Sequence, residues 1–371
     1  MAESVPNRTS LHRLAKLGTS PWIDNITREW FENGKLAELV SQGIVGLTSN
    51  PTIFAAAIAS TTLYDEQINS LSERGLDSRS IALELAKSDI SQAARVLAPV
   101  YRETGHKDGW ASIEVDPDLA YQPGPTLTAV RSMRKAIAEP NVMIKIPATA
   151  EGLGPIEEAI AQGTSVNVTL IFSIERYREV FAAFVRGARR FLGGGGDPAV
   201  LGSVASFFVS RLDTALDPLL VQAGRGDLAG KSAVAQARLA YAAFREMASA
   251  PEAAELFAKG LRPQRPLFAS TSTKNPAYPK LLYVESLIGP DSVNTMPLAT
   301  VDEMLAHGDP SRATVADHVE SSRHLLEDQL PAAGIDLGAV TAELEVAGVE
   351  SFSKAWAGLM SEIEKKAGTP A

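Results

Sequence analysis

The sequence predicts a (β/α)8 barrel with additional helices, especially at its C-terminal end. Short apolar runs rich in β-branched residues alternate with longer helical stretches, which is typical of a parallel sheet covered by helices. Eight such runs occur in 371 residues, which fits one barrel domain over residues 1–371 with a helical extension from about residue 301. An open doubly wound sheet is the alternative, but the glycine-rich motif expected after an early strand is absent.

The early elements are predicted from apolar periodicity and from punctuating residues. Ser10 is the expected N-cap of a first helix and Gly18 its stop, and Pro51 is expected to stop the second strand. The strands expected in this part are 21–26, 44–50 and 110–115. The helices expected here are 10–17, 27–42, 63–103 with breaks near 75 and 77, and 126–138.

The later elements continue the same alternation. A run of four glycines at 193–196 is expected to stop one long helix. The remaining strands are expected at 142–148, 165–172, 204–211, 266–271 and 292–297. The remaining helices are expected at 152–162, 174–191, 231–248, 252–260 and over most of 301–366.

Composition narrows the classes of function. The chain is 45% hydrophobic and 21% charged, as is ordinary for a globular protein, and its net charge of −9 disfavours nucleic acid as a partner. It has no cysteine, which excludes disulfides and thiolate chemistry and fits a reducing compartment. No apolar run is long enough to span a membrane, and residues 1–8 lack a signal-like apolar segment. We therefore expect a cytoplasmic protein without a membrane partner.

Lys145 lies in the middle of the apolar strand 142–148. Burying an ammonium group is costly unless it is paired or loses its proton. The lysine is therefore expected to be either a structural ion pair or an amine whose lowered pKa makes it a nucleophile able to form a Schiff base.

Polar residues share one face of several predicted strands. Because successive side chains of a strand point to opposite faces, Val142, Ile144 and Ile146 are expected to pack under helices while Lys145 points inward. By the same rule, Leu170 should share the outward face of its strand with Val166 and Val168. Inward polar residues near the C-terminal ends of strands are where barrel active sites lie. The set comprises Asp24, Asn50, Glu114, Lys145, Asn167, Thr169 and Ser206.

These residue types suit Schiff-base chemistry on a phosphorylated polyol. Lys145 supplies the amine, Glu114 and Asp24 two separate proton-transfer groups, and Thr169 can position a water for Glu114. Donor hydroxyls would be held by Asn50, Asn167 and Ser206. Arg211 can bind phosphate bidentately and Lys274 adds a point charge, although an ion pair between Arg211 and Asp213 is an equal alternative. The five histidines show no ligand spacing, so no metal site is expected.

Six stretches of the chain carry a further signal: Gly46–Phe54 (GLTSNPTIF), Ile113–Asp116 (IEVD), Ile144–Thr149 (IKIPAT), Asn167–Phe172 (NVTLIF), Ser206–Asp213 (SFFVSRLD) and Ala269–Pro276 (ASTSTKNP). On these motifs, the strands resemble those of the transaldolase family, from about residue 17 to 217 and more weakly to 297. The loop and the long helical part after the seventh strand are similar to the longer actinobacterial form.

The resemblance implies a specific activity. Lys145 would form an imine with the dihydroxyacetone unit of sedoheptulose 7-phosphate or fructose 6-phosphate. That unit would pass to glyceraldehyde 3-phosphate or erythrose 4-phosphate, in the non-oxidative pentose phosphate pathway, without metal or organic cofactor. Thr48 and Phe208 complete the implied substrate-binding set. Lys274 stands where many shorter members have arginine, and it lacks the fork geometry of that side chain.

Two other functions remain open. A stand-alone Schiff-base aldolase would have the same barrel and lysine but would release its product to water. The inward Phe208 favours transfer, because it offers no proton donor to the carbanion. A non-catalytic barrel that only binds sugar phosphates is the second alternative. The sequence is compatible with a monomer or a homodimer.

Overall fold

The computed structural model describes residues 9–368 and forms a closed barrel of eight parallel strands in the order β1 to β8. This confirms the predicted fold class. The N-terminal segment 1–8, in which no secretory signal was expected, lies outside the described residues. The strands are β1 (Thr19–Asp24), β2 (Gly46–Thr48), β3 (Trp110–Glu114), β4 (Val142–Pro147), β5 (Val166–Ile171), β6 (Ser203–Phe208), β7 (Arg265–Ala269) and β8 (Ser292–Met296).

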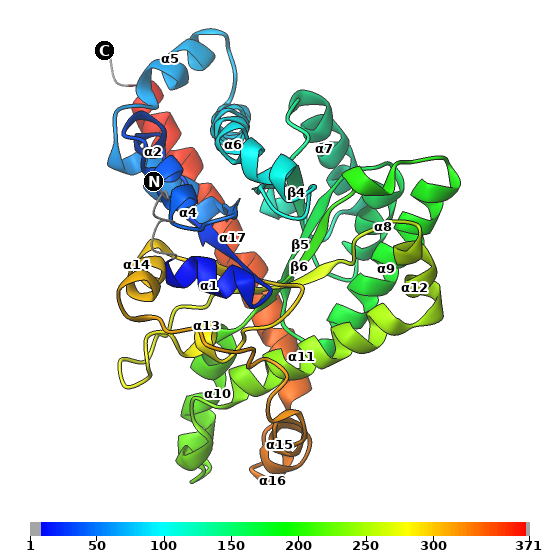
Figure 1. Cartoon of the computed structure of the whole chain (residues 1–371). Helices are drawn as coiled ribbons and strands as arrows, with labels where there is room; N and C mark the ends of the chain where they lie inside the picture. The colour runs from blue at the N-terminus through cyan, green and yellow to red at the C-terminus, as the bar shows by residue number, and fades with distance from the viewer. Residues whose placement is uncertain (1–8, 369–371) are drawn as a thin grey trace, which may run out of the picture.

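Helices surround the barrel and cross one of its ends. They include α1 (Ser10–Lys16), α2 (Glu29–Glu32), α3 (Lys35–Ser41), α4 (Pro51–Ser60), α5 (Asp65–Glu73), α6 (Ser78–Glu103), α7 (Pro123–Ala136), α8 (Leu153–Ala161) and α9 (Ile174–Gly193). The later ones are α10 (Ser210–Gln222), α11 (Ser232–Ser249), α12 (Pro251–Ala258), α13 (Leu282–Glu285), α14 (Leu298–His307), α15 (Val319–His324), α16 (Leu330–Ala332) and α17 (Leu337–Ala367). Figure 1 shows α17 running diagonally across the molecule, from beside α15 to beside α5.

Several expected helix boundaries were wrong for local reasons. The first helix is capped by Thr9, not Ser10, because the Thr9 hydroxyl accepts from the His12 amide. The helix expected at 27–42 is split at Gly34, whose φ of 75° is left-handed. Helix α4 was missed: Pro51 starts it rather than only ending the strand, and the Asn50 side chain caps it. The sixth strand ends at Phe208, and Ser210 already begins α10.

The predicted alternation of side chains is confirmed on β4. Val142, Ile144 and Ile146 join the large core between strands and helices, while Met143 joins a smaller cluster inside the barrel. Leu170 was wrongly placed on the outward face. A register irregularity follows Val168, and Leu170 has a φ of 61°, so its side chain packs inside the barrel.

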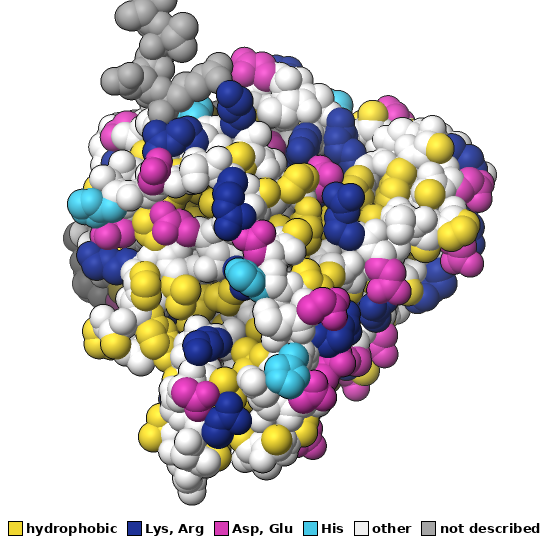
Figure 2. All heavy atoms as spheres, turned by 60° about the horizontal axis from the view of Figure 1, so that its bottom comes forward, with side chains coloured by type: hydrophobic (Ala, Val, Ile, Leu, Met, Phe, Trp, Pro, Cys, Tyr) yellow, Lys and Arg dark blue, Asp and Glu magenta, His cyan; other side chains and the backbone are white. Residues whose placement is uncertain are grey.

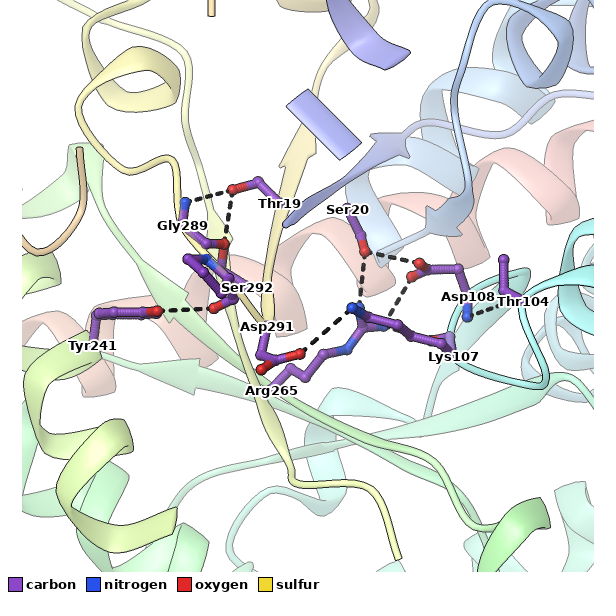
Figure 3. Close-up of polar contacts among 11 residues, drawn as sticks. Thr19, Ser20, Thr104, Lys107, Asp108, Tyr241, Arg265, Gly289, Asp291 and Ser292 are labelled. Atoms are coloured by element: carbon purple, nitrogen blue, oxygen red, sulfur yellow. Dashed lines mark hydrogen bonds and ion pairs between the residues drawn. The ribbon is translucent and has the colours of Figure 1, made fainter. Parts of the chain in front are cut away.

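The N-terminal ends of the strands are closed by a buried polar network (Figure 3). Arg265 Nη2 donates to Asp108 Oδ1 at 2.9 Å and Arg265 Nη1 to Ser20 Oγ at 2.8 Å. Ser20 Oγ in turn donates to Asp108 Oδ2 at 2.9 Å. This end of the barrel is therefore filled by paired charges, and the open end is the opposite one. Within residues 9–368 no helix is both long and apolar enough to cross a membrane.

Candidate active site

A cavity of about 290 Å³ opens at the C-terminal end of the barrel. Its walls come from strand ends, the loops that follow them, and α17. Nine of the predicted site residues line it, namely Asp24, Thr48, Asn50, Lys145, Thr169, Ser206, Phe208, Arg211 and Lys274. Glu114 and Asn167, the other two, lie directly behind this wall, where they contact Lys145 and Ser206.

The side chain of Lys145 extends from β4, and its amine lies at the cavity wall next to Glu114 of β3. Its Nζ donates to Glu114 Oε2 at 3.1 Å and to the Ser49 carbonyl at 2.9 Å. The side chains of Lys145 and Glu114 are 6% and 4% exposed. The expected ion pair of this lysine is confirmed, and its role as a nucleophile stays a prediction for an amine that also lines a cavity.

Asp24 and Glu114 both interact electrostatically with Lys145. Burial raises the pKa of Glu114, while Lys145 acts in the opposite direction and the charge of Asp24 adds to the rise. Burial likewise raises the pKa of Asp24, against the attraction of Lys145 and a hydrogen bond from Thr48. Thr48 Oγ1 donates to Asp24 Oδ1 at 2.7 Å. Asp24 and Glu114 thus have different hydrogen-bond partners, as two separate proton-transfer roles require.

Two buried polar atoms beside the lysine have no hydrogen-bond partner among the described residues. They are Glu114 Oε1 and Thr169 Oγ1. An unsatisfied buried polar group costs about 1–3 kcal/mol. Thr169 also lines the cavity, with its hydroxyl oxygen buried in the wall.

Asn167 supports the wall from behind. It is fully buried; its Oδ1 accepts from Ser206 Oγ at 2.7 Å and its Nδ2 donates to Ser112 Oγ at 3.1 Å. This arrangement orients the Ser206 hydroxyl on the cavity side. The contact between Ser112 and Asn167 could not be predicted from the sequence.

Asn50 caps α4 and also lines the cavity. Its Oδ1 accepts from the Ile53 amide at 3.0 Å and so caps α4. The Nδ2 group remains available to the cavity that Asn50 lines. The cap fixes the orientation of the side chain before any ligand arrives.

Arg211 borders the cavity from the first turn of α10. It makes no ion pair or hydrogen bond within residues 9–368, and burial lowers its pKa. The alternative ion pair with Asp213 is wrong, because Asp213 is buried and accepts from the Ala233 amide and the Tyr283 hydroxyl. Lys274 is exposed on the loop after β7, where its Nζ donates to Ser272 Oγ at 2.7 Å.

The last residue in the sequence that lines the cavity, Phe352, comes from α17. The ring of Phe352 lies 6.0 Å from Lys145 Nζ and is 4% exposed. Sequence reasoning did not find Phe352, because nothing local shows that this helix crosses the barrel. Thr295 of β8 was also missed; its hydroxyl lies 2.7 Å from that of Thr48.

The fold and the cavity together define a (β/α)8 barrel with a lysine-centred site at its open end. The family model described as Transaldolase/Fructose-6-phosphate aldolase matches residues 21–363. A protein of Saccharopolyspora erythraea named Transaldolase is 45% identical, over 98% of this chain and 99% of its own. Proteins of the same name from Thermobifida fusca and Mycolicibacterium smegmatis are 44% and 43% identical, over 96% of this chain and 98% and 96% of theirs. The chain therefore belongs to the transaldolase/fructose-6-phosphate aldolase family, and it is an enzyme.

Proposed function

We propose that this enzyme is a transaldolase that moves a dihydroxyacetone unit between sugar phosphates through a Schiff base on Lys145. The observation that carries the proposal is the position of Lys145, a buried amine at a cavity wall that is paired with Glu114 and attracts the charge of Asp24. The relatives named Transaldolase support the same reading.

The chemistry begins at the lysine. Lys145 Nζ attacks the carbonyl carbon of a ketose phosphate, such as fructose 6-phosphate or sedoheptulose 7-phosphate, and the carbinolamine loses water to give the imine. Glu114, through a water held by Thr169, moves the protons of these steps. Their unpaired oxygens, Glu114 Oε1 and Thr169 Oγ1, are suited to hold that water.

Carbon–carbon cleavage follows from the imine. Asp24 takes the proton of the hydroxyl on the carbon that becomes the aldehyde, and the electrons of the broken bond enter the imine to form an enamine. The enamine then adds to glyceraldehyde 3-phosphate or erythrose 4-phosphate, and hydrolysis frees Lys145. Thr48, Asn50, Asn167 and Ser206 hold or orient donor hydroxyls, Phe208 keeps proton donors away from the enamine, and Arg211 and Lys274 bind the phosphate.

The cellular setting of the enzyme belongs to the same proposal. The enzyme works in the cytoplasm on small sugar phosphates, in the non-oxidative pentose phosphate pathway, as a monomer or homodimer. A stand-alone aldolase is the second candidate, because the matching family model covers both activities.

Borohydride trapping tests the mechanism. The protein is incubated with fructose 6-phosphate and borohydride, digested, and analysed by peptide mass spectrometry. A reduced three-carbon adduct on Lys145, absent from Lys145→Met, is expected. A folded wild-type protein without an adduct would contradict the Schiff base. Consumption of fructose 6-phosphate only when erythrose 4-phosphate is present would separate transfer from simple aldol cleavage.

A further inference from the structure

A second cavity, of about 540 Å³, lies away from the barrel mouth, between α11, α13 and α15. These helices are in the lower part of Figure 1. Lys231, Arg238, Ser286, His318 and Ser321 contribute polar side chains to its wall. It has no lining residue in common with the candidate active site. Figure 2, which brings the bottom of Figure 1 forward, shows Lys, Arg and His side chains interspersed with acidic and hydrophobic ones on this face.

Arg238 is the unusual residue of this cavity. It is partly buried, and its Nε is fully buried without a hydrogen-bond partner among the described residues. Its guanidinium makes no ion pair within residues 9–368, and burial lowers its pKa. One other arginine among the described residues shares these features. Arg211, at the proposed phosphate site, is partly buried, has no ion-pair or hydrogen-bond partner there, and has its pKa lowered by burial.

The nearby acids are already occupied. Asp317 accepts from Arg312 Nη1 at 2.6 Å. Asp227, which also lines the cavity, accepts from Arg225 at 2.9 and 3.1 Å. Lys231 adds a further positive charge to the wall. An anion would therefore meet a guanidinium that has free donors and few competing carboxylates.

The apolar part of the wall indicates the size of the ligand. Val234, Leu282 and Leu325 line the cavity beside Arg238. A bare inorganic anion would leave these side chains without contacts, whereas a short carbon skeleton would cover them. A planar guanidinium binds phosphate oxygens bidentately.

We propose that this cavity is a second anion site, which binds a small phosphorylated organic molecule through the Arg238 guanidinium, with Lys231 at its edge. This site is distinct from the catalytic cavity, and it does not depend on the proposed reaction. Because it lies on other helices, its occupancy can be measured while the catalytic phosphate contacts are removed.

Titration calorimetry with glycerol 3-phosphate tests the proposal. The background is the full chain carrying Arg211→Gln and Lys274→Gln, which removes both proposed catalytic phosphate contacts. We expect saturable binding in this background, at least tenfold weaker after Arg238→Gln and unchanged after Arg245→Gln. Arg245 lies on the same helix, is exposed, and does not line the cavity. Glycerol should not bind.

Three results would overturn the second anion site. The first is the lack of saturable binding in the background protein up to about 10 mM ligand, well beyond the ~1 mM range of weak specific binding. The second is equal weakening by Arg238→Gln and Arg245→Gln, which would indicate a general field effect. The third is an Arg238-dependent change of oligomeric state without ligand binding, which would assign the cavity to a contact between copies. Thermal melting confirms that each variant is folded.

Discussion

Glu114 and Lys145 lie opposite each other on the neighbouring strands β3 and β4, with Lys145 Nζ 3.1 Å from Glu114 Oε2. A buried ion pair is weak evidence of stabilisation, because desolvation of both charges opposes their attraction. Lys145 lines the cavity, and one Glu114 oxygen has no hydrogen-bond partner among the described residues. We therefore infer that the ion pair keeps the Lys145 amine in contact with a proton acceptor, Glu114, until a substrate carbonyl binds.

Glu114→Gln is expected to slow imine formation. The amide keeps the shape of the side chain but cannot accept a proton, and loss of a general acid–base group typically costs ~10²–10⁴-fold in rate. The measurement is the single-turnover rate of borohydride trapping with fructose 6-phosphate. Glu139→Gln is the control, since Glu139 pairs with the exposed Arg95 and does not line the cavity. A trapping rate equal to that of the control would show that Glu114 does not act in this step.

Phe352→Ala is expected to loosen the coupling of donor cleavage to transfer. The ring is buried, 6.0 Å from Lys145 Nζ, and its removal would let water reach the enamine. We expect more release of the three-carbon unit to water, measured as fructose 6-phosphate consumed without acceptor relative to transfer. The truncation should also lower stability by ~3–5 kcal/mol. Phe352→Leu, which keeps an apolar cover, should retain the wild-type ratio; an unchanged ratio in Phe352→Ala would refute this role of α17.

Regular alternation of apolar and polar residues made the barrel and most of its candidate site predictable from the sequence. Irregular backbone geometry and long-range contacts could not be predicted in this way. Asp24, Glu114 and Lys145 were found because a polar residue on the inward parity of a buried strand stands out. The same rule failed at Leu170, where a bulge and a φ of 61° turn the side chain inward. Phe352 could not be found, since its contact with Lys145 depends on how α17 crosses the barrel. Helix α4 could have been found, because Asn50 before Pro51 is a standard helix start.

Asp213 is expected to make stability depend on pH. Burial raises its pKa to about 6, although the Ala233 amide and the Tyr283 hydroxyl both donate to it. The folded state therefore binds the proton more tightly than the unfolded state, and the contribution of Asp213 falls as pH rises from about 4 to 6. A shift of about two units corresponds to ~3 kcal/mol.

Asp213→Asn isolates this contribution. Urea unfolding of both proteins between pH 4 and 7 should show the wild type losing up to ~3 kcal/mol relative to the variant as pH rises. Above pH 7 the difference should be constant. A difference that does not change with pH across this window would mean that Asp213 titrates at its ordinary value in the folded protein.

Arg265→Met is expected to destabilise the closed end of the barrel. It leaves Asp108 and Ser20 without their shared donor, and breaking one partner of a buried pair costs ~3–5 kcal/mol. The control is Lys259→Met, whose pair with Glu255 is exposed to solvent and should contribute little to stability. Adding Asp108→Leu to Arg265→Met should restore part of the loss, since the unpaired charge is removed. Equal free energies of unfolding for the two single variants would contradict this account.

Arg211 and Lys274 are expected to contribute unequally to phosphate binding. Arg211 is partly buried, has no acid partner within residues 9–368, and its guanidinium carbon lies 5.2 Å from the centre of the Phe208 ring, so its fork is ordered before the ligand binds. Lys274 is an exposed point charge on a loop, where water screens its field. A charge-assisted hydrogen bond is worth about 1.5–3 kcal/mol, so Arg211→Gln should lower kcat/KM for fructose 6-phosphate by ~10–100-fold. Lys274→Gln should lower it only a few-fold.

The decisive comparison is with unphosphorylated fructose at high concentration. Both variants should use fructose as well as the wild type does, because the lost contact is made only to phosphate. If Arg211→Gln reduced turnover of fructose as strongly as that of fructose 6-phosphate, Arg211 would be acting on the reacting carbons or on the fold of α10, and the phosphate would have to bind elsewhere on the rim.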